Sequence, residues 1–217
     1  MKKMINKLQK FFKLSLLEKY NFVSTIYWKL KSRFWYKLFL GAMGHKSFII
    51  SPLMISRPDR IFIGDRVSIK PGARLEVVQS NRMRLPILSI GDGSNLEQNA
   101  HIACHNRIVI GKNVSITANC SIVDINHPCT NPDLTKSLAN LIVDEPTFVE
   151  IGDRVMLGVG TVVLPNVRIG KGAVIGANSV VTHDIPPYAI AAGAPAKVLR
   201  IYHTEASQDK SEEKPCE

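Results

Sequence analysis

Aliphatic side chains recur every six residues between Val149 and Val181. The aliphatic positions are Ile151, Leu157, Val163, Ile169, Ile175 and Val181, and a small or β-branched residue stands two places before each of them (Val149, Val155, Thr161, Val167, Ala173 and Ser179). A helix needs a period near 3.6 and a single strand a period of 2, so neither explains this spacing. A chain that repeats a short strand and a bend does, because every sixth side chain then enters one interior. The pattern predicts a parallel β-solenoid of hexapeptide repeats.

Glycine follows the aliphatic residue in four of these repeats, at Gly152, Gly158, Gly170 and Gly176. Glycine lacks a Cβ and therefore adopts positive φ without steric cost. We expect these glycines to turn the corners of the solenoid with positive φ.

The same step runs through the first half of the chain, beginning near Phe48. Its aliphatic positions are Ile63, Ile69 and Leu75, then Ile90, Leu96, Ile102 and Ile108, and after a shift of two Ile110, Ile116 and Ile122. A polar stretch at 79–86, with Arg82 and Arg84, interrupts it. Residues 124–148 interrupt it again and are rich in Asn, Asp and Pro. Long loops on a rigid scaffold commonly carry function, so we expect the second excursion to hold the site.

Both ends of the chain depart from the repeat. Apolar residues of 4–20 and 23–38 fall on one helical face each, with Asn21 as the expected N-cap of the second helix. Residues 197–203 are expected to form a short closing helix and 204–217 a disordered tail. The predicted organisation is a helical segment at 1–46, an all-β solenoid at 47–190 with its excursion at 124–148, and a closing helix and flexible tail at 191–217.

Charge is concentrated at the N-terminus. Residues 1–46 hold eleven Lys and Arg against one acid, Glu18, while the remainder has 17 of each sign and is neutral. A neutral body argues against nucleic-acid binding. The basic amphipathic segment fits either interfacial helices on an anionic membrane, or a cap packed on the end of the solenoid or on a neighbouring subunit. No apolar run approaches the roughly 20 residues that a spanning helix needs.

Cysteine usage and the N-terminus bear on location. The four cysteines, Cys104, Cys120, Cys129 and Cys216, show no CxxC spacing. The N-terminal stretch also lacks the apolar core and A-x-A site of a secretory signal. We expect a cytoplasmic protein with reduced thiols, peripheral at the inner face of the membrane if residues 1–40 bind lipid.

Five segments together resemble a known family. They are IGKNV (110–114), DINHP (124–128), VEIGDRVMLG (149–158), VIGANSVVTHDIPPY (174–188) and AAGAPAKVLR (191–200). This order is similar to that of the hexapeptide-repeat acetyltransferases, and most of all the sugar and polysaccharide O-acetyltransferases of the galactoside, maltose and colanic-acid type. The resemblance covers about residues 60–201. It implies a left-handed parallel β-helix, homotrimers with active sites between subunits, acetyl-CoA as donor and a sugar hydroxyl as acceptor.

His127 is the expected general base. Acetyl transfer from a thioester requires removal of a proton from an alcohol, and an imidazole that titrates near neutrality can accept that proton and return it to the leaving thiolate. Asp124, Asn126 or a backbone carbonyl would hold the ring in the needed tautomer. Position and resemblance together favour this role over that of a solvated loop histidine.

The resemblance also implies where the coenzyme binds. The pantetheine arm would run along coil edges at Val159 and Ala177, where small residues such as Gly158 and Gly176 let it approach the backbone. The nucleotide end would meet Thr182, His183, Lys197 and Arg200. Lys197 and Arg200, three apart on the expected helix, would present one cationic face to phosphate.

Several positions depart from the galactoside enzymes. Glu97 stands where those enzymes have a hydrogen-bonding Asn, His105 replaces a substrate-binding acid, and Met156 replaces a frequent Trp. Glu97 and His105 are therefore the expected substrate-binding residues, and the acceptor is expected not to be a galactoside.

Three alternatives to O-acetylation stay open. An amine acceptor, such as an amino sugar, would use the same machinery. The histidines at 101, 105 and 127 are enough in number for a three-His zinc site like that of the γ-class carbonic anhydrases, although the acyltransferase loop and tail argue against a metal. A non-enzymatic membrane scaffold would need no His127. The sequence thus predicts an acetyl-CoA-dependent O-acetyltransferase that modifies a surface-polysaccharide sugar.

Overall fold

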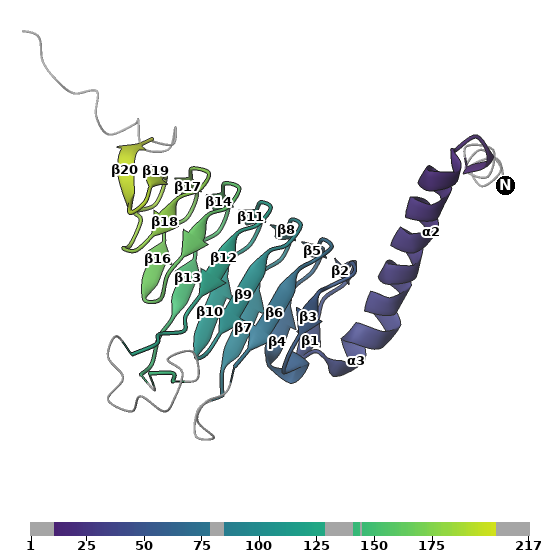
Figure 1. Cartoon of the computed structure of the whole chain (residues 1–217), viewed down its shortest axis with the longest axis horizontal. Helices are drawn as coiled ribbons and strands as arrows, with labels where there is room; N and C mark the ends of the chain where they lie inside the picture. The colour runs from purple at the N-terminus through teal and green to yellow at the C-terminus, as the bar shows by residue number, and fades with distance from the viewer. Residues whose placement is uncertain (1–10, 79–84, 129–140, 144, 203–217) are drawn as a thin grey trace, which may run out of the picture.

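The protein is a triangular prism of stacked coils from which one helical arm projects (Figure 1). The computed structural model describes residues 11–78, 85–128, 141–143 and 145–202. The expected disordered tail beyond 203 and the arginines at 82 and 84 lie outside these residues. Among the described residues no helix is both long and apolar enough to cross a membrane.

Three parallel sheets form the sides of the prism, and each coil contributes one strand to each sheet. Sheet A contains β1 (Ala42–Met43), β4 (Ile61–Ile63), β7 (Ile87–Ile90), β10 (Arg107–Ile110), β13 (Val149–Ile151) and β16 (Val167–Ile169). Sheet B contains β2 (Phe48–Ile49), β5 (Ser68–Ile69), β8 (Asn95–Leu96), β11 (Ser115–Ile116), β14 (Met156–Leu157), β17 (Val174–Ile175), β19 (Ala189–Gly193) and β20 (Ala196–Ile201). Sheet C contains β3 (Met54–Ile55), β6 (Arg74–Val77), β9 (His101–Cys104), β12 (Ser121–Val123), β15 (Val162–Val163) and β18 (Val180–Val181).

The interior confirms the six-residue pattern. Every aliphatic position predicted from that step, from Ile63 to Val181, is no more than 3% exposed. Equivalent residues of successive coils stack in register, as Ile122 on Val163 and Val163 on Val181. Full burial of such a side chain is worth about 1.5–3 kcal/mol, so this column of aliphatics is the main stabilising element of the prism.

The glycines that follow the aliphatic residues do not have the predicted positive φ. Positive φ falls two residues later, at Arg154, Gly160, Asn166, Gly172 and Asn178. At Gly158, a Cβ would lie 2.5 Å from the backbone nitrogen of Ala177 in the next coil. The lack of a Cβ there serves the close stacking of coils, whereas the bend itself is carried by residues, often Asn, that tolerate the left-handed region.

The N-terminal arm consists of α2 (Leu16–Lys31), a π-helical turn η1 (Ser32–Tyr36) and the short α3 (Lys37–Phe39). Its cap is Ser15, in a capping box with Glu18, and not the predicted Asn21, which lies within the helix. Serine followed three residues later by Glu satisfies two backbone donors at once, which explains this starting point.

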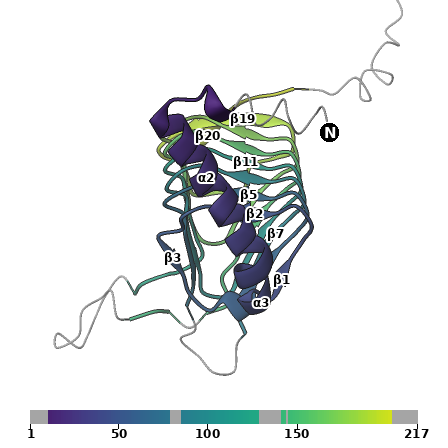
Figure 2. The ribbon, with the colours of Figure 1, turned by 90° about the vertical axis from the view of Figure 1, so that its right-hand side faces the viewer.

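The arm leaves the prism at its first coil. No residue of α2 is buried. The helix points away from the coils in Figure 1, and in Figure 2, which looks at that end of the prism, it lies in front of them. Most of α2 thus does not pack on the end of the chain's own solenoid, although α2 and η1 contact β2; membrane binding and packing on a neighbouring subunit stay predictions. Ser32 fixes the base of the arm, because its buried hydroxyl accepts from the Ile49 N–H at 2.8 Å and shares its one hydrogen between the carbonyl oxygens of Trp28 and Ile49, at 2.8 and 3.1 Å.

The other end of the prism is closed by a strand and not by the predicted helix at 197–203. Strand β20 pairs antiparallel with β19 and completes sheet B. Without it, β19 would be an open edge with unpaired backbone groups, and the β-branched Val198 and Ile201 suit the strand that covers it.

Candidate active site

The expected site residues divide between two edges of the prism. We call edge CA the line of corners where the chain passes from sheet C to sheet A, and edge BC the line between sheets B and C. The excursion at 124–148 leaves β12 at edge CA and returns to β13. Edge CA also carries His105, Thr182 and His183, whereas edge BC carries Glu97, Val159 and Ala177.

His127 lies exposed at the start of the excursion, four residues after Val123, the last residue of β12. Its Nδ1 is 2.8 Å from the carbonyl oxygen of Leu141, on the returning part of the same loop. One residue earlier, the Asn126 carbonyl accepts from the Val143 N–H at 2.9 Å. The outgoing and returning arms of the excursion are thus joined beside the imidazole.

The Leu141 contact determines which nitrogen of His127 can act as a base. A carbonyl oxygen can only accept, so Nδ1 of the neutral ring carries the hydrogen and Nε2 keeps the lone pair. The ring is oriented by a backbone carbonyl, which was one of the three predicted possibilities. Asn126 supports this arrangement through its main chain.

Asp124 does not orient His127 as an acid partner. Its side chain is fully buried, and its carboxylate accepts from the backbone N–H groups of His105, Asn106 and Arg107, the last two at 2.9 and 2.7 Å. These three hydrogen bonds join the Asp124 carboxylate to the turn between β9 and β10. The desolvation caused by burial raises the pKa of this carboxyl, with the three N–H donors opposing the shift. Asp124 is a structural clamp at the root of the excursion.

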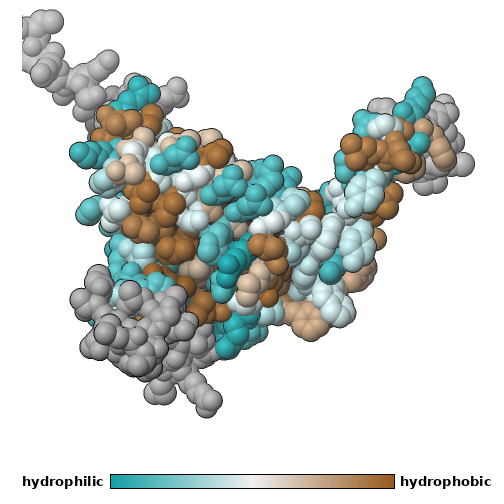
Figure 3. Space-filling view, in the orientation of Figure 1, coloured by the Kyte–Doolittle hydropathy of each residue, from teal (hydrophilic) through white to brown (hydrophobic). Residues whose placement is uncertain are grey.

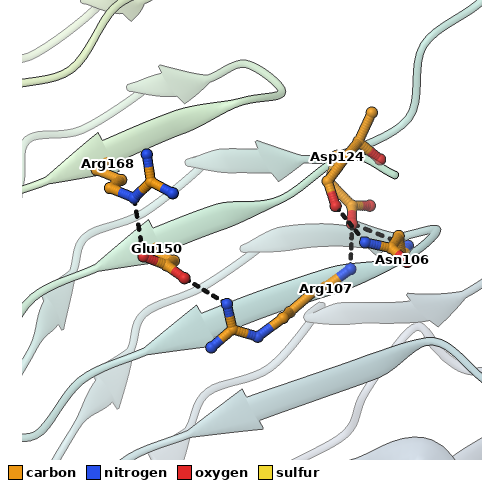
Figure 4. A network of polar contacts seen from close by, with 6 residues as sticks. Asn106, Arg107, Asp124, Glu150 and Arg168 are labelled. Atoms are coloured by element: carbon orange, nitrogen blue, oxygen red, sulfur yellow. Dashed lines mark hydrogen bonds and ion pairs between the residues drawn. The ribbon is translucent and has the colours of Figure 1, made fainter. Parts of the chain in front are cut away.

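Asn106 links both ends of the excursion. Its N–H binds the Asp124 carboxylate, and its side-chain amide donates to the Thr147 carbonyl at 2.5 Å. Figure 4 shows Asn106 beside Asp124, with the neighbouring ion pairs of Glu150 with Arg107 and Arg168. Sequence analysis missed both Asn106 and Leu141, because one acts mainly through geometry and the other through its backbone.

The two expected acceptor residues occupy different environments. His105 is only 2% exposed, so its side chain lies inside edge CA and does not line an open surface of this chain. Glu97 lies on edge BC, where its Oε1 accepts from the Asn95 side-chain amide at 2.5 Å. Within one chain these two residues do not meet.

The expected coenzyme residues are exposed or half-buried along the last coils. Val159 and Ala177 are at equivalent corners of consecutive coils, and Thr182 Oγ1 lies 2.7 Å from His183 Nδ1. The small Gly158 and Gly176 serve coil stacking: the latter's Cβ position lies 2.8 Å from Ala192 Cβ. The approach of a pantetheine arm to the backbone at these glycines stays a prediction.

Lys197 and Arg200 share a face for a different reason from the helix first expected. A bulge shifts the β19–β20 register, so that Lys197 pairs with Ala192 and Arg200 with Ile190. These partners are two apart on one strand and point to the same side of the sheet. Both cations are exposed there.

The histidines of the zinc alternative do not form a cluster. His101 Nε2 lies 4.0 Å from Glu76, while His105 is enclosed at edge CA and His127 is exposed on the excursion. Over the described ranges, no three His, Cys, Asp or Glu side chains are arranged to hold a metal ion.

Comparison with known proteins agrees with the repeat pattern. Residues 148–183 match the family model "Bacterial transferase hexapeptide (six repeats)". The chain is 32% identical over 161 residues to WbbJ of Escherichia coli K12, whose assignment as a lipopolysaccharide biosynthesis O-acetyl transferase is provisional; the match covers 71% of this chain and 78% of WbbJ. It is 43% identical over 93 residues to a galactoside O-acetyltransferase of Lactococcus lactis, covering 43% and 42% of the two chains.

Two solved structures share the architecture. An N-acyltransferase of Bacillus cereus, AntD, in complex with dTDP and 3-hydroxybutyryl-CoA, has a TM-score of 0.63 at 19% identity, covering 77% of this chain and 86% of that one. A hexapeptide-repeat acetyltransferase of Vibrio cholerae complexed with acetyl coenzyme A has a TM-score of 0.54 at 23% identity, covering 78% and 75%. These likenesses confirm the left-handed parallel β-helix.

Proposed function

We propose, since this chain belongs to the hexapeptide-repeat acetyltransferases, that it transfers an acetyl group from acetyl-CoA to a sugar hydroxyl of a surface polysaccharide. The observation that carries this proposal is the His127 ring, exposed on the excursion with Nδ1 bound to the Leu141 carbonyl. The provisional role of WbbJ in lipopolysaccharide biosynthesis supports the class of acceptor.

The reaction follows from the free Nε2. This nitrogen accepts the hydroxyl proton while the sugar oxygen attacks the thioester carbonyl and forms the new C–O bond. The tetrahedral intermediate then collapses, the C–S bond breaks, and the imidazolium returns its proton to the CoA thiolate. The hydrogen bond to Leu141 stays in place throughout, because Nδ1 keeps its hydrogen in both protonation states of the ring.

The coenzyme is proposed to lie along the C-terminal coils. Val159 and Ala177 are exposed at successive corners of edge BC, and the face shared by Lys197 and Arg200 suits the phosphates of the nucleotide. Thr182 and His183 add polar groups at edge CA.

We further propose that the site is completed between subunits of a homotrimer. Within one chain, His127 is on edge CA and the pantetheine residues Val159 and Ala177 are on edge BC. A neighbouring copy that brings its edge BC against this edge CA would unite them.

Mixing two inactive variants, His127→Ala and Ala177→Trp, tests this arrangement. Hybrid trimers should regain activity, because some sites then combine two intact edges. Mixing without any recovery, in samples shown to exchange subunits, would argue for sites built within one chain.

The arm is proposed to hold the enzyme at the cytoplasmic face of the membrane, near lipid-linked acceptors. Its exposed apolar residues include Leu16 (87%), Tyr20 (69%), Val23 (55%) and Leu30 (51%). In Figure 3 hydrophobic residues gather near the far end of the projecting helix. Lysines along the same helix complement an anionic surface, which favours lipid as the partner.

The acceptor is identified by a panel experiment. Purified protein is incubated with acetyl-CoA and with nucleotide sugars, glycan fragments and their amino-sugar analogues, and thiol release is followed. Turnover with a hydroxyl acceptor is expected. Turnover confined to amino sugars would instead establish N-acetylation, and release with none of them above the rate in buffer would contradict acyl transfer to sugars.

A further inference from the structure

A cationic groove lies where the arm joins the prism, at the end opposite β20. Its volume is about 370 Å³, within the range of roughly 300–1,000 Å³ typical of small-ligand sites. Lys29, Arg33 and Lys37 line it from the helical side. His45 and Lys46 line it from the first corner of the prism.

The walls of the groove are fixed by hydrogen bonds. Ser32 ties the helical wall to Ile49, as described above. Ser47 ties the other wall to the second coil, because its hydroxyl donates to the Gly64 carbonyl at 2.6 Å and accepts from the Val67 N–H at 2.9 Å. The hydroxyls of both serines are therefore already hydrogen-bonded within the protein. The cationic side chains are the groups that would bind a ligand in the groove.

The carboxylate that contacts the groove lining, that of Asp65, accepts from the backbone N–H of His45 at 2.6 Å and, among the described residues, forms no ion pair with the groove's Lys and Arg side chains. Some cations elsewhere on the body are paired, as Lys112 with Asp92 at 3.0 Å. Within the described part of the chain, no ion pair involves any of the four Lys and Arg side chains that line the groove. Lys29 is instead 4.9 Å from the centre of the Phe48 ring. Like charges gathered around one cavity repel one another, and an anion removes that cost.

We propose that this groove binds a phosphate or diphosphate group carried by a membrane lipid. Several cations around one small volume match the charge of such a group, while Phe48 and Met43 provide apolar contact beside it. The groove is separate from the proposed coenzyme site, because β2 and β20 lie at opposite ends of sheet B.

The position of the groove next to the arm favours a membrane lipid as the molecule that carries the phosphate. Leu30 and Phe34, 51% and 64% exposed, are one residue from Lys29 and Arg33 on the same helical segment. An arm lying in the interfacial layer would therefore carry the groove to the depth of the headgroups. The inference rests on the proposed membrane contact and is independent of the acyl-transfer chemistry.

The experiment compares two pairs of substitutions in the full-length chain. Lys37→Gln with Lys46→Gln removes two charges from the groove, and Lys13→Gln with Lys19→Gln removes two from the arm outside it. Binding of inorganic diphosphate is measured by calorimetry. Binding to phosphatidylcholine vesicles is measured with phosphatidic acid or, at equal surface charge, phosphatidylglycerol.

The groove pair is expected to weaken diphosphate binding about 10-fold or more, because two charge-assisted contacts to the anion are lost, while the arm pair leaves it unchanged. The groove pair should also abolish any preference for phosphatidic acid, whose phosphate is a monoester. Equal effects of the two pairs on diphosphate would overturn the site. Loss of diphosphate binding with an unaltered vesicle preference would overturn the lipid assignment. Acetyl transfer to a small acceptor should be equal in all variants, which separates this test from that of the enzyme activity.

Discussion

The His127 imidazole and the Leu141 carbonyl oxygen are held 2.8 Å apart by the two arms of one loop. The proposed general base is therefore oriented by the fold of the excursion, through a backbone carbonyl.

Replacing the base should separate chemistry from binding. His127→Ala is expected to lower acetyl transfer by about 100-fold or more, the scale of a lost general base, with acetyl-CoA affinity retained. Turnover and calorimetric binding measure the two effects. The matched control is His183→Ala, a second exposed histidine at the same edge, which is expected to weaken acetyl-CoA binding more than it lowers kcat. Wild-type turnover of His127→Ala would remove this residue from the mechanism.

Removing the Asp124 clamp should affect both stability and activity. Asp124→Ala leaves three backbone N–H groups of the β9–β10 turn without their acceptor, and each buried unsatisfied donor costs about 1–3 kcal/mol. We expect a loss of at least about 2 kcal/mol in urea unfolding and a lower kcat. Asp184→Ala is the control, because this exposed carboxylate accepts from only one N–H, that of Arg168, at 2.6 Å. Equal losses in the two variants would contradict the clamp.

Glycines that allow the coils to stack closely and glycines with positive φ at the bends should respond differently to substitution. Gly158→Ala places a Cβ 2.5 Å from the Ala177 nitrogen, and overpacking of this kind costs about 1–3 kcal/mol. Gly160→Asn should be tolerated, since Asn119 and Asn178 hold similar positive φ in adjacent coils, and the atom closest to its Cβ position is the side-chain Oδ1 of Asn178, which can move, and not backbone. Thermal unfolding of both variants tests the distinction, which a similar loss in each would refute.

Acidification should destabilise the prism through His101. Burial and, secondarily, the nearby Arg74 lower the pKa of His101 below its ordinary value of 6.5, and Glu76 only partly opposes them. The unfolded chain then binds the proton more strongly, so this contribution to stability is present above about pH 6.5 and is lost as the pH falls. His101→Gln should flatten the dependence of the urea midpoint between pH 7.5 and 5. An unchanged slope would show that other groups control it.

Membrane binding should depend on the exposed stripe of α2. Replacing Leu16, Tyr20 and Val23 together by Asn is expected to release the protein from anionic vesicles without lowering its Tm, because none of the three is buried. Leu53→Asn serves as the control, since Leu53 is 76% exposed on the prism. Co-sedimentation measures the effect. If the triple variant sediments with vesicles as the wild type does, the arm has another partner.

Much of the fold could be predicted because every coil of the solenoid needs the same residue types at the same positions. Each buried aliphatic, such as Leu157, has the same neighbours as its equivalent one coil away, so a local pattern determines a global structure. The closing strand could not be predicted in this way. Val198 and Ile201 form a strand only because β19 presents an open edge to them, and this is a property of the assembled sheet.

The site was less predictable than the fold. His127 stood out because of its residue type and its position in the excursion. Asp124 is as conspicuous in the sequence, yet its burial turns it toward the β9–β10 turn and away from the imidazole. The ring's true partner is the Leu141 backbone, and any residue type could supply that carbonyl.

The two ends of the excursion lie close together, because Asn106 binds the Asp124 carboxylate at one end and the Thr147 carbonyl at the other. The spacing between its two roots is set by the coil beneath, whatever the number or kind of residues that lie between them. Such a loop can be exchanged for another without a change in any strand above or below it. Under the proposed function, changes in the excursion that keep His127 and Leu141 in place would alter the acceptor, while the coils proposed to receive the donor stay as they are.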